Sequence, residues 1–487
     1  MSRHLVIIGG GITGMAAAYA FATDPRARTA GWRCTLIEGE PRLGGKLRTE
    51  RVGECLIEHG PDSFLATKPQ AADLCRALGL GDRLIGTTPG RAVYVAYRGR
   101  LHPLPDGMAL GIPTRVWPLV RTGLLSPTEK LRAAADLVLP RGHGSGDETV
   151  GAFVRRRLGG AVADRLAGPL LGGIYAGDPD RLSLRATFPV LADWEAVHRS
   201  LVLAALARQR NAHTRSAETT PGAARPEGTG GGSIFLSLVG GLGELVEHLG
   251  ASLEDAEGVT LLVGRTARRV LRRIEAGRTS YLVDLDDGRT LDADALLLAA
   301  PAFASAALLE PLAPQAASSL RAIPYVSTAA VTLAFRRETI HHPLDGHGFV
   351  AARGEPLAIT ACTWVSSKWA HRAPPDLVLL RCYLGAAGRE AVVEEDDAHL
   401  VGLARADLRI TMGIEAEPVF ARVARWFRAM PQYLPGHLER LEAIEASLRA
   451  LPHVALAGAG YRGIGIPDCI RQGTEAARRL VDEIRAA

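Results

Sequence analysis

A run of apolar residues near the N-terminus leads directly into a turn made of glycine. The segment His4–Ile8 predicts a buried strand, three consecutive glycines follow, and a helix begins after them. Such a unit needs a tight turn at its first glycine and bare backbone where phosphate groups approach the helix amides. The chain therefore predicts a Rossmann-like α/β domain with a dinucleotide phosphate site. The residues assigned to this site are Gly9, Gly10, Gly11, Ile12, Thr13 and Gly14.

A second strand supplies the acid that such a site requires. The apolar segment Cys34–Ile37 ends at Glu38. This glutamate follows the glycine turn at close to the roughly 20 residues typical of the carboxylate that binds ribose hydroxyls. We therefore assign Glu38 and the adjoining Gly39 to the cofactor site. A glycine turn without any ligand is the alternative for the first segment alone.

The next two segments indicate which dinucleotide binds. A second glycine pair, Gly44-Gly45, comes directly after the ribose acid, and the segment Glu58–Phe64 contains a further glycine. A nicotinamide dehydrogenase needs no bare backbone there, whereas the long isoalloxazine–ribityl arm of a flavin passes this point. Ordinary turns could explain either segment alone, but both together favour FAD. The residues assigned here are Lys46, Gly60, Pro61, Asp62 and Ser63.

A further cofactor segment lies near the other end of the chain. Val454–Gly460 predicts a buried strand that enters a glycine turn, and a helix is expected from about Cys469. Pro467 near a helix start costs no hydrogen bond, and the exposed amides there could stabilise negative charge on a reduced flavin. A strand and helix that merely close the sheet are the alternative. The residues assigned are Ala459, Ile464, Gly465 and Ile466.

The composition of the chain argues against several other classes of protein. The chain has 487 residues, of which 47% are hydrophobic, and a net charge of +5. Its basic runs lack interleaved aromatic residues, so we expect no nucleic-acid binding. The six cysteines form no CxxC pair, which favours reduced thiols and argues against a zinc site. With no apolar run of about 18 residues and no leader before the first strand, we expect a soluble cytoplasmic protein without stable membrane insertion.

The order of the segments predicts an α/β fold with three parts. The FAD-binding domain is discontinuous and takes residues 1–90, 232–305 and 440–487. Residues 91–231 have mostly helical periodicity and form a helical domain that covers the substrate cavity. Residues 306–439 are rich in strand-like segments and form a mixed-sheet substrate domain.

These residues and several internal motifs resemble one family. The chain is similar to the bacterial FAD-dependent porphyrinogen oxidases, within the amine-oxidase-like flavoproteins, over nearly its whole length. The glycine fingerprint is common to the porphyrinogen oxidases and the wider group of amine-oxidase-like flavoproteins, so it does not distinguish between them. The internal motifs are more specific to the porphyrinogen oxidases. The motifs that carry the resemblance are 9–14, 42–46, 60–64, 101–105, 111–114, 174–178, 359–364, 430–433 and 465–470.

The resemblance implies a reaction. We expect a six-electron oxidation of coproporphyrinogen III to coproporphyrin III in haem biosynthesis, with O2 as acceptor and release of H2O2. A protoporphyrinogen IX oxidase on the same fold is the first alternative, and an amine oxidase is a more distant one. From another class, the chain could bind flavin or tetrapyrrole without turnover. The resemblance also implies transient contact with a ferrochelatase-type enzyme of the haem pathway.

No catalytic triad, metal cluster or acid–base pair is evident in the sequence, so the catalytic residue is unknown. His59 could relay a proton, although a packed histidine is the simpler interpretation. Lys68 and, less directly, Arg91 are candidate cations for substrate propionates, with solvated surface residues as the alternative. Tyr175 is a candidate for the cavity lining or equally a core residue. By resemblance, the strand near Ala267 passes the adenine.

Overall fold

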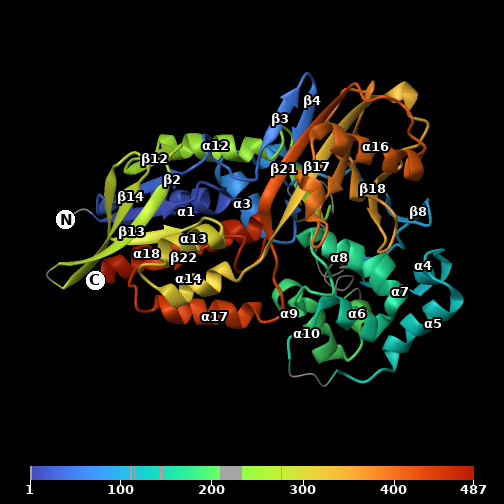
Figure 1. The fold of residues 1–487 in the computed structure, drawn as a ribbon, viewed down its shortest axis with the longest axis horizontal. Coiled ribbons are helices and arrows are strands. Elements are labelled where there is room, and N and C mark those ends of the chain that lie inside the picture. Colours follow the sequence, from blue (N-terminus) through green and yellow to red (C-terminus); the bar gives the residue numbers. More distant parts are fainter. Residues whose placement is uncertain are drawn as a thin grey trace, which may run out of the picture.

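A five-stranded parallel sheet forms the first part of the molecule (Figure 1). The computed structural model describes residues 3–90, 92–109, 112–113, 116–142, 146–208, 233–275 and 277–486. All five residues of β1 (His4–Ile8) are buried, as expected of a strand with neighbours on both edges and both faces. The strand order is β12 (Val259–Val263), β2 (Arg33–Glu38), β1 (His4–Ile8), β16 (Ala295–Leu298) and β22 (Val454–Leu456).

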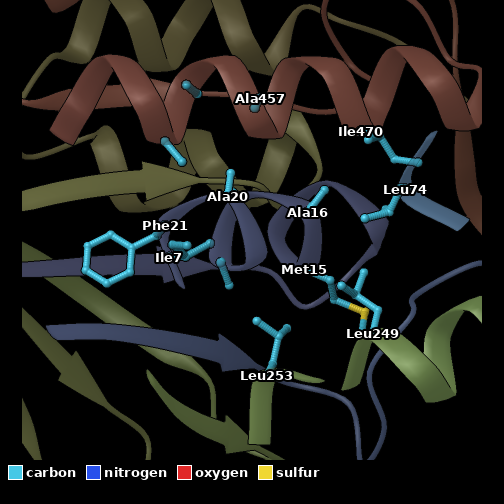
Figure 2. Close-up of a cluster of buried hydrophobic side chains, with 14 of the residues drawn as sticks. Ile7, Met15, Ala16, Ala20, Phe21, Leu74, Leu249, Leu253, Ala457 and Ile470 are labelled. Atoms are coloured by element: carbon cyan, nitrogen blue, oxygen red, sulfur yellow. The ribbon is translucent and has the colours of Figure 1, made fainter. Parts of the chain in front are cut away.

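Helix α1 (Ile12–Ala22) lies in the centre of this part. It is apolar almost all round, which is the pattern of a helix buried on every side. Figure 2 shows small residues such as Ala16 and Ala20 facing α18 (Ile466–Ala486), whereas Met15 points toward Leu249 of α12 (Gly243–Glu254). The two ends of the chain are therefore packed together by α1 and α18.

Other helices and small sheets complete the Rossmann-like part. Helix α3 (Pro69–Ala77) packs against α18. An antiparallel sheet flanks the parallel one and contains β13 (Ala267–Glu275), β14 (Arg278–Leu285) and β15 (Thr290–Ala293). Further strands are β3 (Thr49–Val52) with β4 (Cys55–Glu58), and β5 (Phe64–Leu65) with β11 (Phe235–Leu238) and β6 (Leu84–Gly86).

A seven-stranded mixed sheet forms the second part. Its central strand β17 (Tyr325–Arg336) is buried at every position from Ala329 to Phe335, and its core side chains include Val331 and Leu333. Helix α16 (Asp397–Met412) covers the sheet, and the short helix α15 (Val365–Lys368) connects two of its strands. The strand order is β21 (Phe420–Pro431), β17 (Tyr325–Arg336), β20 (Leu377–Leu384), β19 (Ile359–Trp364), β18 (Gly346–Ala351), β7 (Ala92–Tyr97) and β8 (Arg100–Pro103).

Three predicted boundaries differ from this arrangement, and the one at 439/440 falls inside α17 (His437–Leu448). Residues 92–103 were expected in the helical domain, but β7 pairs in parallel with β18 and extends the seven-stranded sheet. Helix α13 (Ala302–Leu309) crosses the expected boundary at 305/306 and α14 (Pro314–Arg321) lies beyond it, but the buried side chains of both share a core with β1 and β16. The boundary at 231/232 lies outside the described residues. With these shifts the three-part division remains our proposal.

The helical part lies below the seven-stranded sheet, far from both termini (Figure 1). Its core is built on large side chains such as Phe153, Leu166 and Trp194. Ser126 precedes α5 (Pro127–Ala134) and forms a capping box, in which its hydroxyl accepts from the Glu129 amide and its own amide donates to the Glu129 carboxylate. Its main helices are α4 (Val116–Arg121), α5 (Pro127–Ala134), α6 (Val150–Leu158), α8 (Gly168–Tyr175), α9 (Leu184–Thr187) and α10 (Pro189–His198), and α17 (His437–Leu448) leads back to the first part.

Candidate functional site

The glycine turn between β1 and α1 is closed on every side except one. Gly9 has a φ of +113°, and a Cβ there would lie 2.7 Å from the carbonyl carbon of Ala299. A Cβ on Gly14 would lie 1.9 Å from the Gly9 carbonyl oxygen, so any side chain would push α1 off the strand. Around Gly11, in contrast, no atom lies within 4 Å of a Cβ position. The turn is therefore open where a phosphate group would meet the first amides of α1.

Glu38 lies at the carboxyl end of β2, beside this turn. Its carboxylate accepts hydrogen bonds from the amides of Gly10, at 2.6 Å, and Glu40, at 2.8 Å. The strand β12 ends next to it, because Val263 pairs with Glu38. A Cβ on Gly39 would lie 3.2 Å from Thr266 Oγ1, and Ala267 then begins β13. The structure thus brings Glu38, Gly39 and Ala267 to one edge of the parallel sheet.

The second glycine pair packs directly on the first. The Gly44 amide donates to the Gly10 carbonyl at 2.8 Å, and a Cβ on Gly45 would lie 3.2 Å from the Gly11 Cα. Lys46 follows and its ammonium donates to the carbonyl of Ala429 at the end of β21. Burial lowers the pKa of Lys46. This lysine therefore joins the cofactor side of the molecule to the seven-stranded sheet.

The segment after β4 is fixed by side chains from the seven-stranded sheet. Arg381 of β20 donates to the carbonyls of His59, at 3.0 Å, and Gly60, at 2.6 Å. Trp426 of β21 donates to the same His59 carbonyl at 2.7 Å. A Cβ on Gly60 would lie 1.8 Å from the Lys46 carbonyl oxygen, so only glycine fits there. The segment is held in place by residues that sequence reasoning had not assigned to the site.

Two side chains of this segment have protein partners. The Asp62 carboxylate accepts from Lys368 Nζ at 2.8 Å and from the Ser63 hydroxyl at 2.8 Å. Burial would raise the pKa of Asp62, but the Lys368 charge outweighs it and holds that pKa below its usual range. The His59 ring is buried and lies 2.8 Å from a Glu50 oxygen, as expected of a histidine packed in the protein interior. Pro61 is exposed.

The C-terminal turn is clamped by a tyrosine. The Tyr433 hydroxyl donates to the Ala459 carbonyl at 2.6 Å and accepts from the Gly463 amide at 3.0 Å. Gly463 has a φ of +106°, which a side chain disfavours. The turn ends at Ile464 and Gly465, and α18 begins at Ile466. That start is earlier than expected because Pro467 fits the first helical turn.

The two cofactor segments meet although they lie at opposite ends of the chain. The strand β16 separates β1 from β22, and a Cβ on Gly458 would lie 3.8 Å from Thr13 Oγ1. On α18, a Cβ on Gly473 would lie 2.1 Å from the Thr13 carbonyl oxygen. Sequence reasoning missed Gly473, whose only signal is a small residue in an amphipathic helix. The open turn at Gly11 and the clamped turn at 458–465 therefore form one continuous candidate site.

The candidate substrate residues lie in different surroundings. Lys68 directly precedes α3, and its ammonium lies 2.7 Å from both carboxylate oxygens of Asp468, while 44% of the side chain is exposed. Tyr175 is buried and its ring packs on Tyr433, with 5.5 Å between centroids, and on Phe188. Burial raises the pKa of Tyr175. Arg91 lies outside the described residues.

Comparison with known proteins identifies the class of this site. A sequence model of the flavin-containing amine oxidoreductases matches residues 12–481, and the chain belongs to that family. Coproporphyrinogen III oxidase of Bacillus subtilis is 40% identical over 475 residues and covers 97% of both chains. The enzyme of the same name from Propionibacterium freudenreichii is 39% identical over 99% of this chain and 92% of its own.

Solved structures agree with the family. A crystal structure assigned to a protoporphyrinogen oxidase from Exiguobacterium superposes with a TM-score of 0.84, at 35% identity and 99% coverage of both chains. Cyclohexylamine oxidase of Brevibacterium oxydans, at 17% identity and a TM-score of 0.67, shares the fold. In the described part of the chain, no helix has the length and apolarity to cross a membrane. Those residues also contain no cluster of potential metal ligands.

Proposed function

We propose that this protein binds FAD and oxidises coproporphyrinogen III to coproporphyrin III, with O2 as acceptor and H2O2 as the second product. The observation that carries this proposal is the set of curated relatives with that name, at 32–40% identity over nearly the whole chain. Of the motifs on which the sequence resemblance rested, 9–14, 42–46, 60–64 and 465–470 contain residues that we assign to the candidate site.

When bound, FAD supplies a two-electron acceptor that dioxygen can reoxidise, so three rounds would account for the six electrons. The chain's own residues would hold and orient the reactants. The open amides at Gly11, Ile12 and Thr13 would bind pyrophosphate, and Glu38 would exchange its Gly10 contact for ribose hydroxyls. We also propose the remaining contacts assigned above, from Gly39 and Lys46 through Gly60–Ser63 to Ala267, Ala459 and Ile464–Ile466.

On the substrate side, we propose that Lys68 binds a propionate group. Its pairing with Asp468 places a partly exposed cation beside the turn at 463–465. Approach of a substrate carboxylate would require the ammonium to be shared with Asp468. Tyr175 is proposed for the wall of the cavity, through the aromatic group that it forms with Tyr433. Arg91 remains a second proposed cation.

A second candidate is the oxidation of protoporphyrinogen IX. It is favoured by the Exiguobacterium structure, at 35% identity, and by a chloroplastic protoporphyrinogen oxidase of Arabidopsis thaliana, at 28% identity. The experiment is aerobic turnover of purified holoenzyme with each porphyrinogen, while porphyrin fluorescence and peroxide are measured together. Three peroxides per coproporphyrin would support the proposal. Flavin-loaded protein without turnover would instead indicate a binding protein.

We propose a cytoplasmic place of action and transient contact with a ferrochelatase-type enzyme. All six cysteines are free and buried, which suits a reducing compartment. The active fraction should remain in the supernatant after centrifugation of a lysate without detergent. Activity that sediments with membranes after a high-salt wash would contradict this location.

A further inference from the structure

One carboxylate lies between the residues that we assign to the flavin and those that we assign to the substrate. Asp468 stands in the first turn of α18, which begins at Ile466. It packs on the glycine turn, since a Cβ on Gly463 would lie 2.7 Å from the Asp468 Cγ and one on Gly465 would lie 3.0 Å from its Oδ2. Both of its oxygens lie 2.7 Å from Lys68 Nζ. Asp468 therefore touches both sides of the candidate site.

The surroundings of Asp468 suit a charged group that meets a substrate. Its side chain is 15% exposed, beside that of Lys68, which is 44% exposed. Its negative charge also reaches Tyr175, because it adds to the effect of burial in raising the pKa of that hydroxyl. The helix dipole of α18 favours negative charge in the first turn. A carboxylate is thus held next to both candidate substrate residues, Lys68 and Tyr175.

The other carboxylates that we assign to the site are engaged differently. Glu38 accepts from two backbone amides at the first glycine turn and is assigned to the ribose. Asp62 accepts from three side chains, and the Lys368 charge holds its pKa below the usual range against the effect of burial. A carboxylate with so low a pKa is a weak base. Both oxygens of Asp468, in contrast, face a single lysine for which the substrate competes.

The proposed oxidation releases protons as well as electrons. In each of its three steps, a C–H bond of a bridging carbon breaks and its hydride passes to the flavin. An N–H bond of an adjoining pyrrole also breaks, and a C=N bond forms. The N–H group becomes acidic once the hydride leaves, so a carboxylate is a sufficient base. One hydride, one proton and one O2 then account for one H2O2.

We propose that Asp468 is the catalytic base that accepts the pyrrole protons, a role that rests on the proposed oxidation of a porphyrinogen. Binding of a propionate by Lys68 draws the ammonium away from Asp468 and leaves its oxygens free for an N–H group. Lys68 thus binds the substrate, and Asp468 takes its proton. The proton is passed on as each H2O2 forms, which restores the carboxylate for the next step.

The test separates binding from rate in purified holoenzymes that are mixed anaerobically with coproporphyrinogen III. Asp468→Asn should slow flavin bleaching at saturating substrate by about 100-fold and leave the half-saturating concentration unchanged, since a general base contributes on the order of 10²–10⁴. Lys68→Met should show the reverse, a raised half-saturating concentration with the saturated rate largely retained. Asp468→Glu keeps a carboxylate and should bleach at least about tenfold faster than Asp468→Asn.

Asp397→Asn is the matched control. Asp397 also lies in the first turn of a long helix, α16, and pairs with a basic residue of another element, Arg425. This variant should bleach at the wild-type rate. Flavin absorbance and the binding of coproporphyrin III should be unchanged in Asp468→Asn, so that loss of either ligand does not account for the slower reaction.

Equal bleaching rates in the wild type and Asp468→Asn would overturn the role of Asp468 and leave the proposed function in place. Equal slowing in Asp468→Asn and Asp468→Glu would indicate a packing role and would also overturn it. A wild type that leaves coproporphyrinogen unoxidised overturns the proposed function, and this role with it.

A crystal structure of the wild-type holoenzyme with coproporphyrin III decides the matter if Asp468→Asn fails to fold. A pyrrole nitrogen within hydrogen-bond reach of the Asp468 carboxylate, directly or through one water, supports the proposal. Pyrrole nitrogens that all lie beyond that reach overturn it.

Discussion

Gly11 is the residue at which cofactor binding and folding can be separated. Because a Cβ there meets no atom within 4 Å, Gly11→Val should leave the fold intact. The valine should instead block the approach of pyrophosphate to the α1 amides. We expect colourless protein with an FAD content reduced at least about tenfold, which corresponds to about 1.4 kcal/mol. Flavin absorbance after gel filtration measures it.

The control is Gly402→Val in α16, an exposed position that is equally open and has no part in the proposed site. It should remain fully yellow, with only a small loss of stability. A Gly11→Val protein with normal FAD content would contradict the placement of the pyrophosphate. Acid precipitation should also release the flavin of the wild type, since we expect no covalent link.

Lys68 tests how substrate charge is recognised. Coproporphyrinogen carries four propionates and protoporphyrinogen two, so Lys68→Met should raise KM more for the former. A partly exposed charge-assisted contact is worth about 1.5 kcal/mol, or about tenfold. Flavin content should not change. Asp468→Asn, which frees the ammonium, is the matched variant and should not raise KM for coproporphyrinogen.

Steady-state kinetics with both substrates decide this prediction. An equal rise in KM for both porphyrinogens would mean that Lys68 does not bind the additional carboxylates. An unchanged KM for both porphyrinogens would mean that Lys68 pairs with Asp468 and does not bind the substrate.

At the scale of elements, the turn between β22 and α18 depends on Tyr433. Tyr433→Phe removes the hydroxyl that joins the Ala459 carbonyl to the Gly463 amide. The unfolding free energy should fall by about 1–2 kcal/mol, and FAD should dissociate more readily. Tyr94→Phe, which removes a partly exposed hydroxyl bonded to Asp345, is the control. Unchanged FAD affinity in Tyr433→Phe would show that the clamp does not serve the cofactor.

Elements were predictable where glycine spacing or apolar runs fixed the backbone locally. The unit from His4 to Gly14 is of this kind, because a Cβ on Gly9 or Gly14 would collide with neighbouring backbone. So is the turn near Gly458, because its φ of +136° favours glycine. The pairing of β7 with β18 was not predictable, since it joins strands far apart in the sequence. The contacts of Arg381 and Lys368 with the segment 59–62 were missed for the same reason.

At the scale of the whole molecule, buried histidines should make stability depend on pH. His437 is fully buried, stacks on Tyr433 at 4.0 Å and donates to the Tyr461 carbonyl, and burial lowers its pKa from 6.5 to about 4. As the pH falls, His437 therefore binds a proton at a higher pH in the unfolded chain than in the folded one. The contribution of His437 to the free energy of unfolding is complete above pH 6.5 and decreases as the pH drops toward 4, by at most about 3 kcal/mol.

His437→Gln should flatten this part of the pH profile, while some slope remains because burial also lowers the pKa of His4 and His59. The exposed His399→Gln in α16 is the control and should keep the wild-type profile. Urea unfolding at several pH values measures both. A His437→Gln profile parallel to that of the wild type would contradict the assignment.

The central claim is that one FAD site, built from both ends of the chain, oxidises a porphyrinogen. The most direct measurement is anaerobic mixing of the purified holoenzyme with coproporphyrinogen III or protoporphyrinogen IX, followed by visible absorbance. We predict rapid bleaching of the flavin with coproporphyrinogen, slower bleaching with protoporphyrinogen, and full return of the yellow colour with peroxide when oxygen is admitted. Flavin that stays oxidised with both substrates would contradict the account, and faster bleaching with protoporphyrinogen would replace the proposed substrate.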